Sequence, residues 1–174
     1  MRQLHIMDSD DYENCTRLNV RHSARAIIIS DGKIAMIHSQ ENNYYKFPGG
    51  GIKRGESKED ALIRETLEET GLHVIPESIK ELGYIHRIRK SLKHEDECFI
   101  QNNYYYFCEV TDVVSETKYD EGELCERFVP IFVDPRIAFN ENAKICENDA
   151  VYGMAYRENL VLQLLIDVMD QNQE

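Results

Sequence analysis

A chain of 174 residues is long enough for one compact domain with a sizeable core and too short for two ordinary domains. Its 32 acidic and 20 basic residues give a net charge of -12, which would repel a nucleic-acid backbone or an anionic membrane, so neither is an expected partner. With 42% hydrophobic residues and no apolar run of bilayer length, we expect a single folded domain over residues 1–174.

The first twenty residues are polar and acidic, without the basic start and apolar stretch of a secretory signal, which favours a cytoplasmic location. This segment is either a flexible tail or an accessory piece with an added strand that contributes to a homodimer. The five cysteines are an odd number without a C-x-x-C pair, so they indicate neither a zinc site nor a redox couple. We expect reduced, mostly buried thiols.

The predicted elements begin with a buried strand over residues 23–30, SARAIIIS, followed by an Asp31-Gly32 turn and a second strand in KIAMIH. Together they form a hairpin. Residues 42–45 are predicted to be a loop that leads into a short extended piece at Lys46-Phe47, and the glycines after Pro48 make tight turns.

Beyond the centre of the chain, extended segments alternate with loops. Strands are predicted over residues 83–89 and 99–110, around the polar loop SLKHEDE, and over residues 127–133. Residues 135–140 allow a short helix, and residues 158–169 place apolar side chains at helical spacing. The class that follows is α/β, with a sheet rather than a helix bundle at its centre.

A helix is predicted over residues 58–70. Ser57 followed by Asp60 is typical of a helix start in which the serine side chain binds an early backbone N–H. Gly71 is well placed to end the helix in a left-handed conformation.

This helix crowds three carboxylates on one face. At about 100° per residue, Glu65, Glu68 and Glu69 fall within roughly a third of the circumference, while Ile63 and Leu67 point to the opposite, packed side. Charge runs are usually solvated faces, yet carboxylates at these spacings repel by about 0.2–0.5 kcal/mol per pair, and no lysine on that face offsets them. A Mg²⁺ or Mn²⁺ ion, which prefers oxygen ligands, would remove the repulsion.

The spacing of the whole stretch carries more information. Gly50 is followed by five residues, Glu56, seven residues and then RETLEETGL, which ends at Leu72. This resembles the signature of the Nudix hydrolases, G-x5-E-x7-R-E-U-x-E-E-x-G-U with U a bulky aliphatic residue, and only Thr66 departs from it, at the first U position. The wider resemblance runs from ARAIII through KFPGGG to YYYFCEV. It implies a Nudix fold, with a mixed β-sheet sandwiched between α-helices, and hydrolysis of a nucleoside diphosphate linked to another group X.

The resemblance also implies roles for individual positions. The two principal metal ligands of the family match Glu68 and Glu69, and a further carboxylate ligand matches Glu65. A backbone carbonyl ligand matches Gly50. Arg64 and Glu56 match the residues that orient those carboxylates. The implied cofactor is Mg²⁺ or Mn²⁺, which would neutralise phosphate charge and lower the pKa of the water that attacks phosphorus.

Many family members use one more carboxylate, from a later loop, as a ligand or general base. Glu121 and Glu123 in YDEGELCERFV are the best-placed candidates, and Glu126 stays open. The alternative for each of them is a plain surface loop, because the whole segment is acidic.

Three arginines on predicted strands, Arg25, Arg87 and Arg89, could bind substrate phosphates in a bidentate manner. An arginine on a strand is more often solvated or ion-paired. The tyrosines at 104–106 could stack on a base, but core packing is the favoured interpretation because aromatics in a strand usually pack inward.

The leading hypothesis is a metal-dependent pyrophosphohydrolase acting on a small-molecule nucleotide, such as a nucleoside triphosphate or 8-oxo-dGTP, as in the MutT-like branch. ADP-ribose or a nucleotide sugar is the alternative substrate. The rival from another class is a nucleotide-binding regulatory module with the same fold and no turnover, followed by a plain acidic interaction domain. The complete set of Glu56, Arg64 and the three helix glutamates argues against both.

Overall fold

The computed structural model describes residues 1–147 and 151–171. Within these residues no helix combines the length and the apolar character needed to cross a membrane. The elements are, in chain order, β1 (Gln3–Asp8), β2 (Arg17–Val20), β3 (Ser23–Ile27), β4 (Ile29–Ser30), β5 (Lys33–Ser39), β6 (Tyr44–Lys46), β7 (Gly49–Gly51), α1 (Lys58–Thr70), β8 (Leu72–Val74), the 3-10 turn η1 (Pro76–Ser78), β9 (Lys80–Lys90), β10 (Glu97–Phe107), β11 (Val110–Val114), α2 (Glu121–Cys125), β12 (Phe128–Val133), α3 (Pro135–Asn142) and α4 (Tyr152–Gln171).

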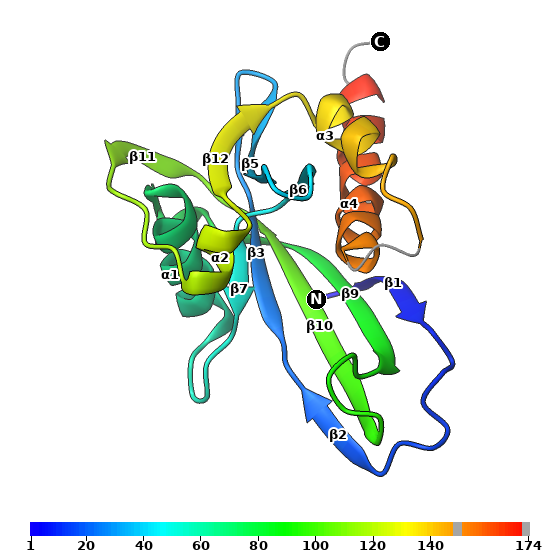
Figure 1. Cartoon of the computed structure of the whole chain (residues 1–174). Coiled ribbons are helices and arrows are strands. Elements are labelled where there is room, and N and C mark those ends of the chain that lie inside the picture. The colour runs from blue at the N-terminus through cyan, green and yellow to red at the C-terminus, as the bar shows by residue number, and fades with distance from the viewer. Residues whose placement is uncertain (148–150, 172–174) are drawn as a thin grey trace.

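The central sheet is mixed. Its strand order is β1-β9-β10-β3-β7, with β2 pairing with β10 off this path. β3 runs parallel to β10, whereas β9 is antiparallel to β10 and β7 is antiparallel to β3. A smaller sheet has the order β12-β5-β4, with β6 on β5. Helix α1 lies on one side of the strands and α3 and α4 on the other (Figure 1), which confirms the predicted sheet between helices.

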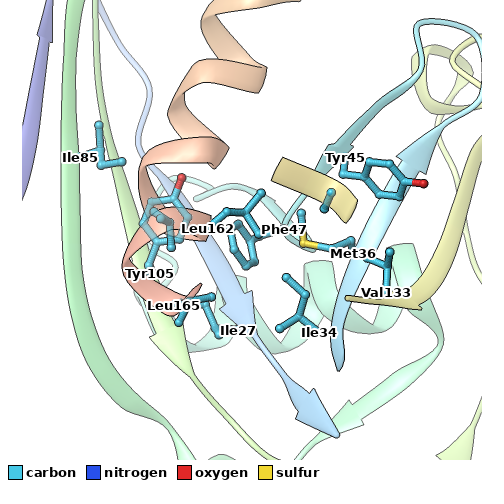
Figure 2. Packing of buried hydrophobic residues seen from close by; sticks show 12 residues of the cluster. Ile27, Ile34, Met36, Tyr45, Phe47, Ile85, Tyr105, Val133, Leu162 and Leu165 are labelled. Atoms are coloured by element: carbon cyan, nitrogen blue, oxygen red, sulfur yellow. The ribbon is translucent and has the colours of Figure 1, made fainter. Parts of the chain in front are cut away.

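The strand β3 shows how the sheet is covered on both faces. Ala24 and Ala26 belong to the core cluster that contains Leu62 of α1. Ile27 belongs to the cluster that contains Leu162 of α4. Because successive side chains of a strand point to opposite faces, a strand covered by helices on both sides is buried along its whole length. In the second cluster the Phe47 ring lies beside Leu162 and meets Tyr105 edge-on, with ring centroids 5.7 Å apart (Figure 2).

Helix α4 is anchored by a buried polar pair as well as by apolar contacts. Glu158 is fully buried and accepts hydrogen bonds from the backbone N–H of Phe47 at 3.2 Å and from Nε of Arg157 at 2.9 Å. Arg157 also donates to the side-chain oxygen of Asn103 at 2.9 Å. The helix therefore begins at Tyr152, earlier than the predicted residue 158, because its first turns are held by polar contacts that apolar periodicity does not reveal.

The first twenty residues are part of the sheet rather than a tail. β1 pairs in parallel with β9, and β2 pairs in parallel with β10, both within the same chain. Residues 3–8 and 17–20 are therefore strands of this chain's own sheet. The contribution of the segment to a homodimer stays a prediction.

Two predicted strands are divided in the structure. The strand predicted over residues 23–30 separates at Ile28 into β3 in the central sheet and β4 in the smaller one. The strand predicted over residues 99–110 ends at Phe107, and β11 pairs instead with β8. β4 and β11 are exposed, yet they carry β-branched residues like the buried strands before them, so residue type does not mark the break.

The prediction of a loop over residues 42–45 is wrong for residues 44 and 45. Tyr44 is 1% exposed and Tyr45 is 8% exposed, and both lie in β6. The Tyr45 ring stacks on His38 of β5, with centroids 4.5 Å apart. Tertiary burial of the two rings overrides the local signal of the preceding asparagines.

The prediction of mostly buried cysteines is also wrong. Cys98 and Cys108 are buried, Cys15 is half-buried, and Cys125 and Cys146 are exposed. The last two lie at or beyond the end of short helical turns, where little of the chain covers them.

We expect Leu162→Ala to lower the free energy of unfolding by about 2–5 kcal/mol, because it opens a cavity where α4 meets the sheet. Urea denaturation checks this value. Leu164→Ala is the matched control, since it removes the same atoms from the same helix at a side chain that is 39% exposed, and its cost should be clearly smaller. Equal losses for the two variants would mean that α4 does not dock as described.

Candidate functional site

A cleft of about 330 Å³ lies beside the glycine strand β7. Its walls bring carboxylates from α1 and α2 into one space with arginines from β3, β9 and α4. This mixture of charges suits a ligand that is anionic and is held together with a cation.

Helix α1 is built as the sequence predicts. Its N-cap residue is Ser57, whose hydroxyl oxygen accepts a hydrogen bond from the Asp60 N–H at 2.9 Å. It ends at Gly71, which has a φ of 73° and donates its N–H to the Leu67 carbonyl at 2.9 Å.

The orientation of this helix differs from the prediction. Ile63 and Leu67, expected on the packed side, are only half-buried, whereas Thr66 is fully buried and Glu69 is 2% exposed. The acidic face points toward β7. Burial of these charges is tolerated because each receives cationic or N–H partners in the cleft, which periodicity of apolar residues cannot show.

One guanidinium holds three of the carboxylates. Arg64 donates to Glu56 through Nε at 2.7 Å and Nη2 at 2.9 Å, and through Nη1 to Glu65 at 2.6 Å and to Glu68 at 3.1 Å. Its Nη2 also reaches the Gly51 carbonyl oxygen at 3.1 Å, so the same side chain ties β7 to α1. These hydrogen bonds from Arg64 lower the pKa of Glu56 to about 2.

Glu69 has separate partners. Its Oε2 accepts from the Gly49 N–H at 2.8 Å, and its Oε1 forms a short ion pair with Nζ of Lys46. Lys46 is itself buried and lies 4.8 Å from the centroid of the Phe128 ring. No sequence pattern marks this lysine, because it stands on a strand 23 residues before its partner and only the fold joins them.

Gly50 is where helix and strand come closest. A Cβ on Gly50 would lie 2.3 Å from Oε2 of Glu65, so any side chain there would displace the carboxylate. Carboxylate and carbonyl oxygens of this kind fit a hard divalent cation by their chemistry. In the arrangement seen, the oxygens are held by Arg64 and Lys46, and no three described Asp, Glu, His or Cys side chains have the layout of a metal site.

The acidic segment before β12 is a short helix, α2, instead of the predicted loop. Asp120 and Glu123 cap it reciprocally, at 2.9 and 2.8 Å. Glu123 lines the cleft, and burial together with the nearby Glu69 carboxylate raises its pKa to about 7. Glu121 is exposed, and Glu126 accepts hydrogen bonds from Ser39 at 2.6 Å and from Asn42 at 2.7 Å. Of the three candidates, only Glu123 lies in the cleft.

The strand arginines divide into two groups. Arg25 is 7% exposed and donates to the carbonyl oxygens of Phe47 and Gly49, so it supports the glycine strand. Arg87 and Arg89 of β9 line the cleft.

Of the three consecutive tyrosines, Tyr105 and Tyr106 are fully buried, as core packing predicts. Tyr104 is half-buried beneath Nζ of Lys58, which lies 4.2 Å from the centroid of its ring.

The model of the NUDIX domain family matches residues 20–143, which is most of the chain and includes the glycine strand, α1 and all of the cleft lining except Met154 and Arg157 of α4. The chain belongs to the NUDIX domain family. The resemblance seen in the signature is thereby confirmed.

Individual Nudix relatives are distant. A curated protein described as "Uncharacterized Nudix hydrolase YvcI" from Bacillus subtilis is 33% identical over 54 residues, which are 31% of this chain and only 34% of that protein. The chain thus matches about a third of the length of this relative. A NUDIX hydrolase from Nitrosomonas europaea has a TM-score of 0.56 at 17% identity, covering 80% of this chain and 88% of that one. The MutT protein from Bacillus halodurans has a TM-score of 0.50 at 14% identity, covering 82% of each chain. These two likenesses show the Nudix fold.

The Arg64 network gives the Nudix site a defined pH dependence. The pKa of Glu56 is lower in the folded protein, about 2, than its usual value of 4.5, so its contribution to stability is present above pH 4.5 and is lost as the pH falls toward 2. We therefore expect the stability difference between the wild type and Glu56→Gln to be largest at neutral pH and to shrink over that interval.

Urea midpoints measured at a series of pH values test this expectation. Glu95→Gln removes an exposed glutamate without an ion pair in the described part of the chain, and it should change stability little at neutral pH. A difference between the wild type and Glu56→Gln that stays constant down to pH 2 would mean that Arg64 does not hold this carboxylate.

Proposed function

We propose that this protein is a metal-dependent Nudix pyrophosphohydrolase that cleaves a nucleoside diphosphate linked to a group X. The observation that carries the proposal is the position of Glu65 at Gly50 and of Glu69 at Gly49, within a cleft that arginines also line. An enzyme that cleaves phosphoanhydrides needs both features, because the substrate is a polyanion and its transition state spreads charge over phosphate oxygens.

The residues of the site have different proposed roles. Gly50, Glu65, Glu68 and Glu69 would hold a Mg²⁺ or Mn²⁺ ion through oxygen atoms. The chemistry supplied by a bound cation is neutralisation of phosphate charge and a lower pKa for the attacking water. Arg64 fixes the orientation of Glu65 and Glu68.

A general base must lie within reach of the attacking water. Glu123 is the candidate that the fold favours, because it lines the same cleft as Glu65 and Glu69 and is fixed there by its bond to the Asp120 N–H. In this proposal its carboxylate takes the proton of the attacking water.

The proposal also concerns the identity of the group X. Nucleoside triphosphates and oxidised nucleotides such as 8-oxo-dGTP come first, as in the MutT-like branch, and ADP-ribose and nucleotide sugars come second. All of them are small anions of the size that a cleft of about 330 Å³ can hold at least in part.

The second candidate function is a nucleotide-binding module without turnover. One observation favours it: Lys46 and Arg64 already neutralise the helix glutamates, so the fold does not require a cation to bury them. The two functions differ in whether product forms, not in whether nucleotide binds.

We expect Glu69→Gln to lower kcat on the best substrate by roughly 100- to 1000-fold, because a neutral amide would hold the proposed cation less well than the carboxylate. Phosphate and pyrophosphate release is measured with 8-oxo-dGTP, nucleoside triphosphates, ADP-ribose, nucleotide sugars and dinucleoside polyphosphates, in Mg²⁺, Mn²⁺ and EDTA. Glu121→Gln removes the same charge at an exposed position and should keep near-normal activity. Nucleotide binding by the wild type without turnover of any substrate would favour the binding module.

A second pair of variants tests the base. Glu123→Gln should lower kcat by about 100-fold or more, with KM nearly unchanged, because general-base assistance is lost while the binding groups stay in place. Glu126→Gln should instead affect stability, since that carboxylate bonds Ser39 and Asn42. Steady-state kinetics with thermal melts of both variants separate these effects, and normal kcat in Glu123→Gln would remove this residue from the mechanism.

A further inference from the structure

Two arginines of β9, Arg87 and Arg89, form no ion pair in the described part of the chain. Arg87 has neither an ion pair nor a hydrogen bond there, although it lies largely inside the protein. Arg89 donates Nη1 to the Lys90 carbonyl oxygen at 2.9 Å, but its Nε is buried without an acceptor. Burying a guanidinium without a carboxylate partner lowers the stability of the fold, so an unpaired buried arginine is typical of a site that binds an anion.

The surroundings of Arg87 contain positive charge and a helix turn without acidic residues. A Cβ on Gly153, in the first turn of α4, would lie 2.1 Å from Nη2 of Arg87, so the guanidinium is packed directly against that turn. This turn contains no acidic residue. Burial, and then the charges of Arg89 and Arg157, lower the pKa of Arg87 to about 10.

The neighbouring carboxylates are engaged elsewhere. Asp8 of β1 accepts from the Asp10 N–H at 2.9 Å and from the Tyr12 hydroxyl at 3.2 Å. Asp11 accepts from the Lys90 N–H at 2.6 Å. The Asp11 carboxylate still acts on Arg89 through its charge, and Glu147, which lines the same cavity, forms an ion pair with neither arginine in the described residues. The charge of the Arg87 guanidinium is therefore left for a ligand.

Arg87 and Arg89 stand at the boundary of two spaces. They line the cleft that contains Glu65 and Glu69, and they also line a cavity of about 530 Å³ beside β1 and the first turn of α4. Both β1 and α4 lie outside residues 20–143, the part that the family model matches. The arginines thus connect the cleft of the glutamates to a space lined by β1 and the first turn of α4.

The sheet places these arginines away from the reacting phosphates. β9 and the glycine strand β7 are separated by β10 and β3, so their backbones lie about 14 Å apart across the sheet. The Arg87 guanidinium packs against Gly153 in the first turn of α4, whereas Glu65 and Glu69 lie at the glycine strand. The two phosphates of one diphosphate are adjacent groups, so a diphosphate held at the glutamates leaves the Arg87 side of the cleft for another group. A phosphate at Arg87 would belong to another part of the same ligand.

We propose that Arg87 and Arg89 form a subsite for a phosphate group that the substrate carries outside the scissile diphosphate. The inference rests on the proposed function and names its substrate class. Two guanidinium groups offer bidentate hydrogen bonds to phosphate oxygens. Arg89 is steadied by the Phe99 ring, whose centroid lies 5.2 Å from its Cζ. The extra phosphate can come from the nucleoside, as a ribose phosphate, or from the far end of X.

The first test measures binding without catalysis. Inorganic phosphate is titrated calorimetrically in EDTA, which removes any contribution from a cation at the glutamates. The wild type should bind, and Arg87→Gln should bind about tenfold or more weakly, because a charge-assisted contact is lost. Arg136→Gln removes the same charge from an exposed arginine paired with Asp134 and Asp170, and it should bind as the wild type does. Equal affinity in all three proteins would overturn the subsite.

Thermal melts test whether a variant binds phosphate weakly because it is unfolded. Arg87→Gln should melt at the same temperature as the wild type or higher, because the substitution relieves repulsion from Arg89 and Arg157. Gly153→Ala is the second variant: its methyl group displaces the guanidinium without changing charge, and it should weaken phosphate binding as well. Normal phosphate binding by folded Gly153→Ala would contradict the described position of Arg87.

Kinetics identify the source of the phosphate. Two matched pairs are compared: a dinucleotide diphosphate with and without a phosphate on its ribose, and a nucleoside tetraphosphate with the triphosphate. Arg87→Gln should raise KM about 10- to 100-fold for the phosphate-bearing member of one pair only, with kcat unchanged. An equal effect on both members of both pairs would overturn the subsite. Phosphate binding that depends on Arg87, without turnover of any nucleotide, would leave the subsite standing and remove the proposed function.

Discussion

The hydrogen-bonded contact of Arg64 with three glutamates is the interaction on which the rest of the cleft depends. It satisfies carboxylates that would otherwise repel one another along α1, and through the Gly51 carbonyl it holds the helix against the glycine strand. Lys46 does the same for Glu69 from the opposite side. Removing one partner from such a set leaves the others buried and uncompensated, which is why a charged network of this kind is retained as a unit.

The distribution of charge separates the exterior of the molecule from its cleft. The chain is acidic overall, with a net charge of -12, yet arginines from three different elements meet at the cleft. A long polyanion would experience repulsion from the surface along its whole length, whereas a small phosphate compound meets only the local field of the arginines. The same arrangement that admits a nucleotide therefore discourages a nucleic acid.

The sequence was informative where local chemistry and spacing act, and silent where distant segments meet. The cap at Ser57, the end of α1 at Gly71 and the positions of the signature residues follow from short-range rules, and the structure has them as expected. Lys46 and the early turns of α4 were missed because their partners, Glu69 and Asn103, lie far away in the sequence. The packed side assigned to Ile63 and Leu67 was misjudged because apolar periodicity does not register the polar contacts that bury Glu69.

The ends of the chain have a consequence for how the family diversifies. β1 and the first turn of α4 surround Arg87 without contributing any residue of the signature. Insertions or substitutions there can reshape what lies next to the cleft while the glutamate helix keeps its geometry. Evolution can then change the ligand of such a protein without rebuilding its chemistry, and two Nudix chains with the same signature need share no metabolite.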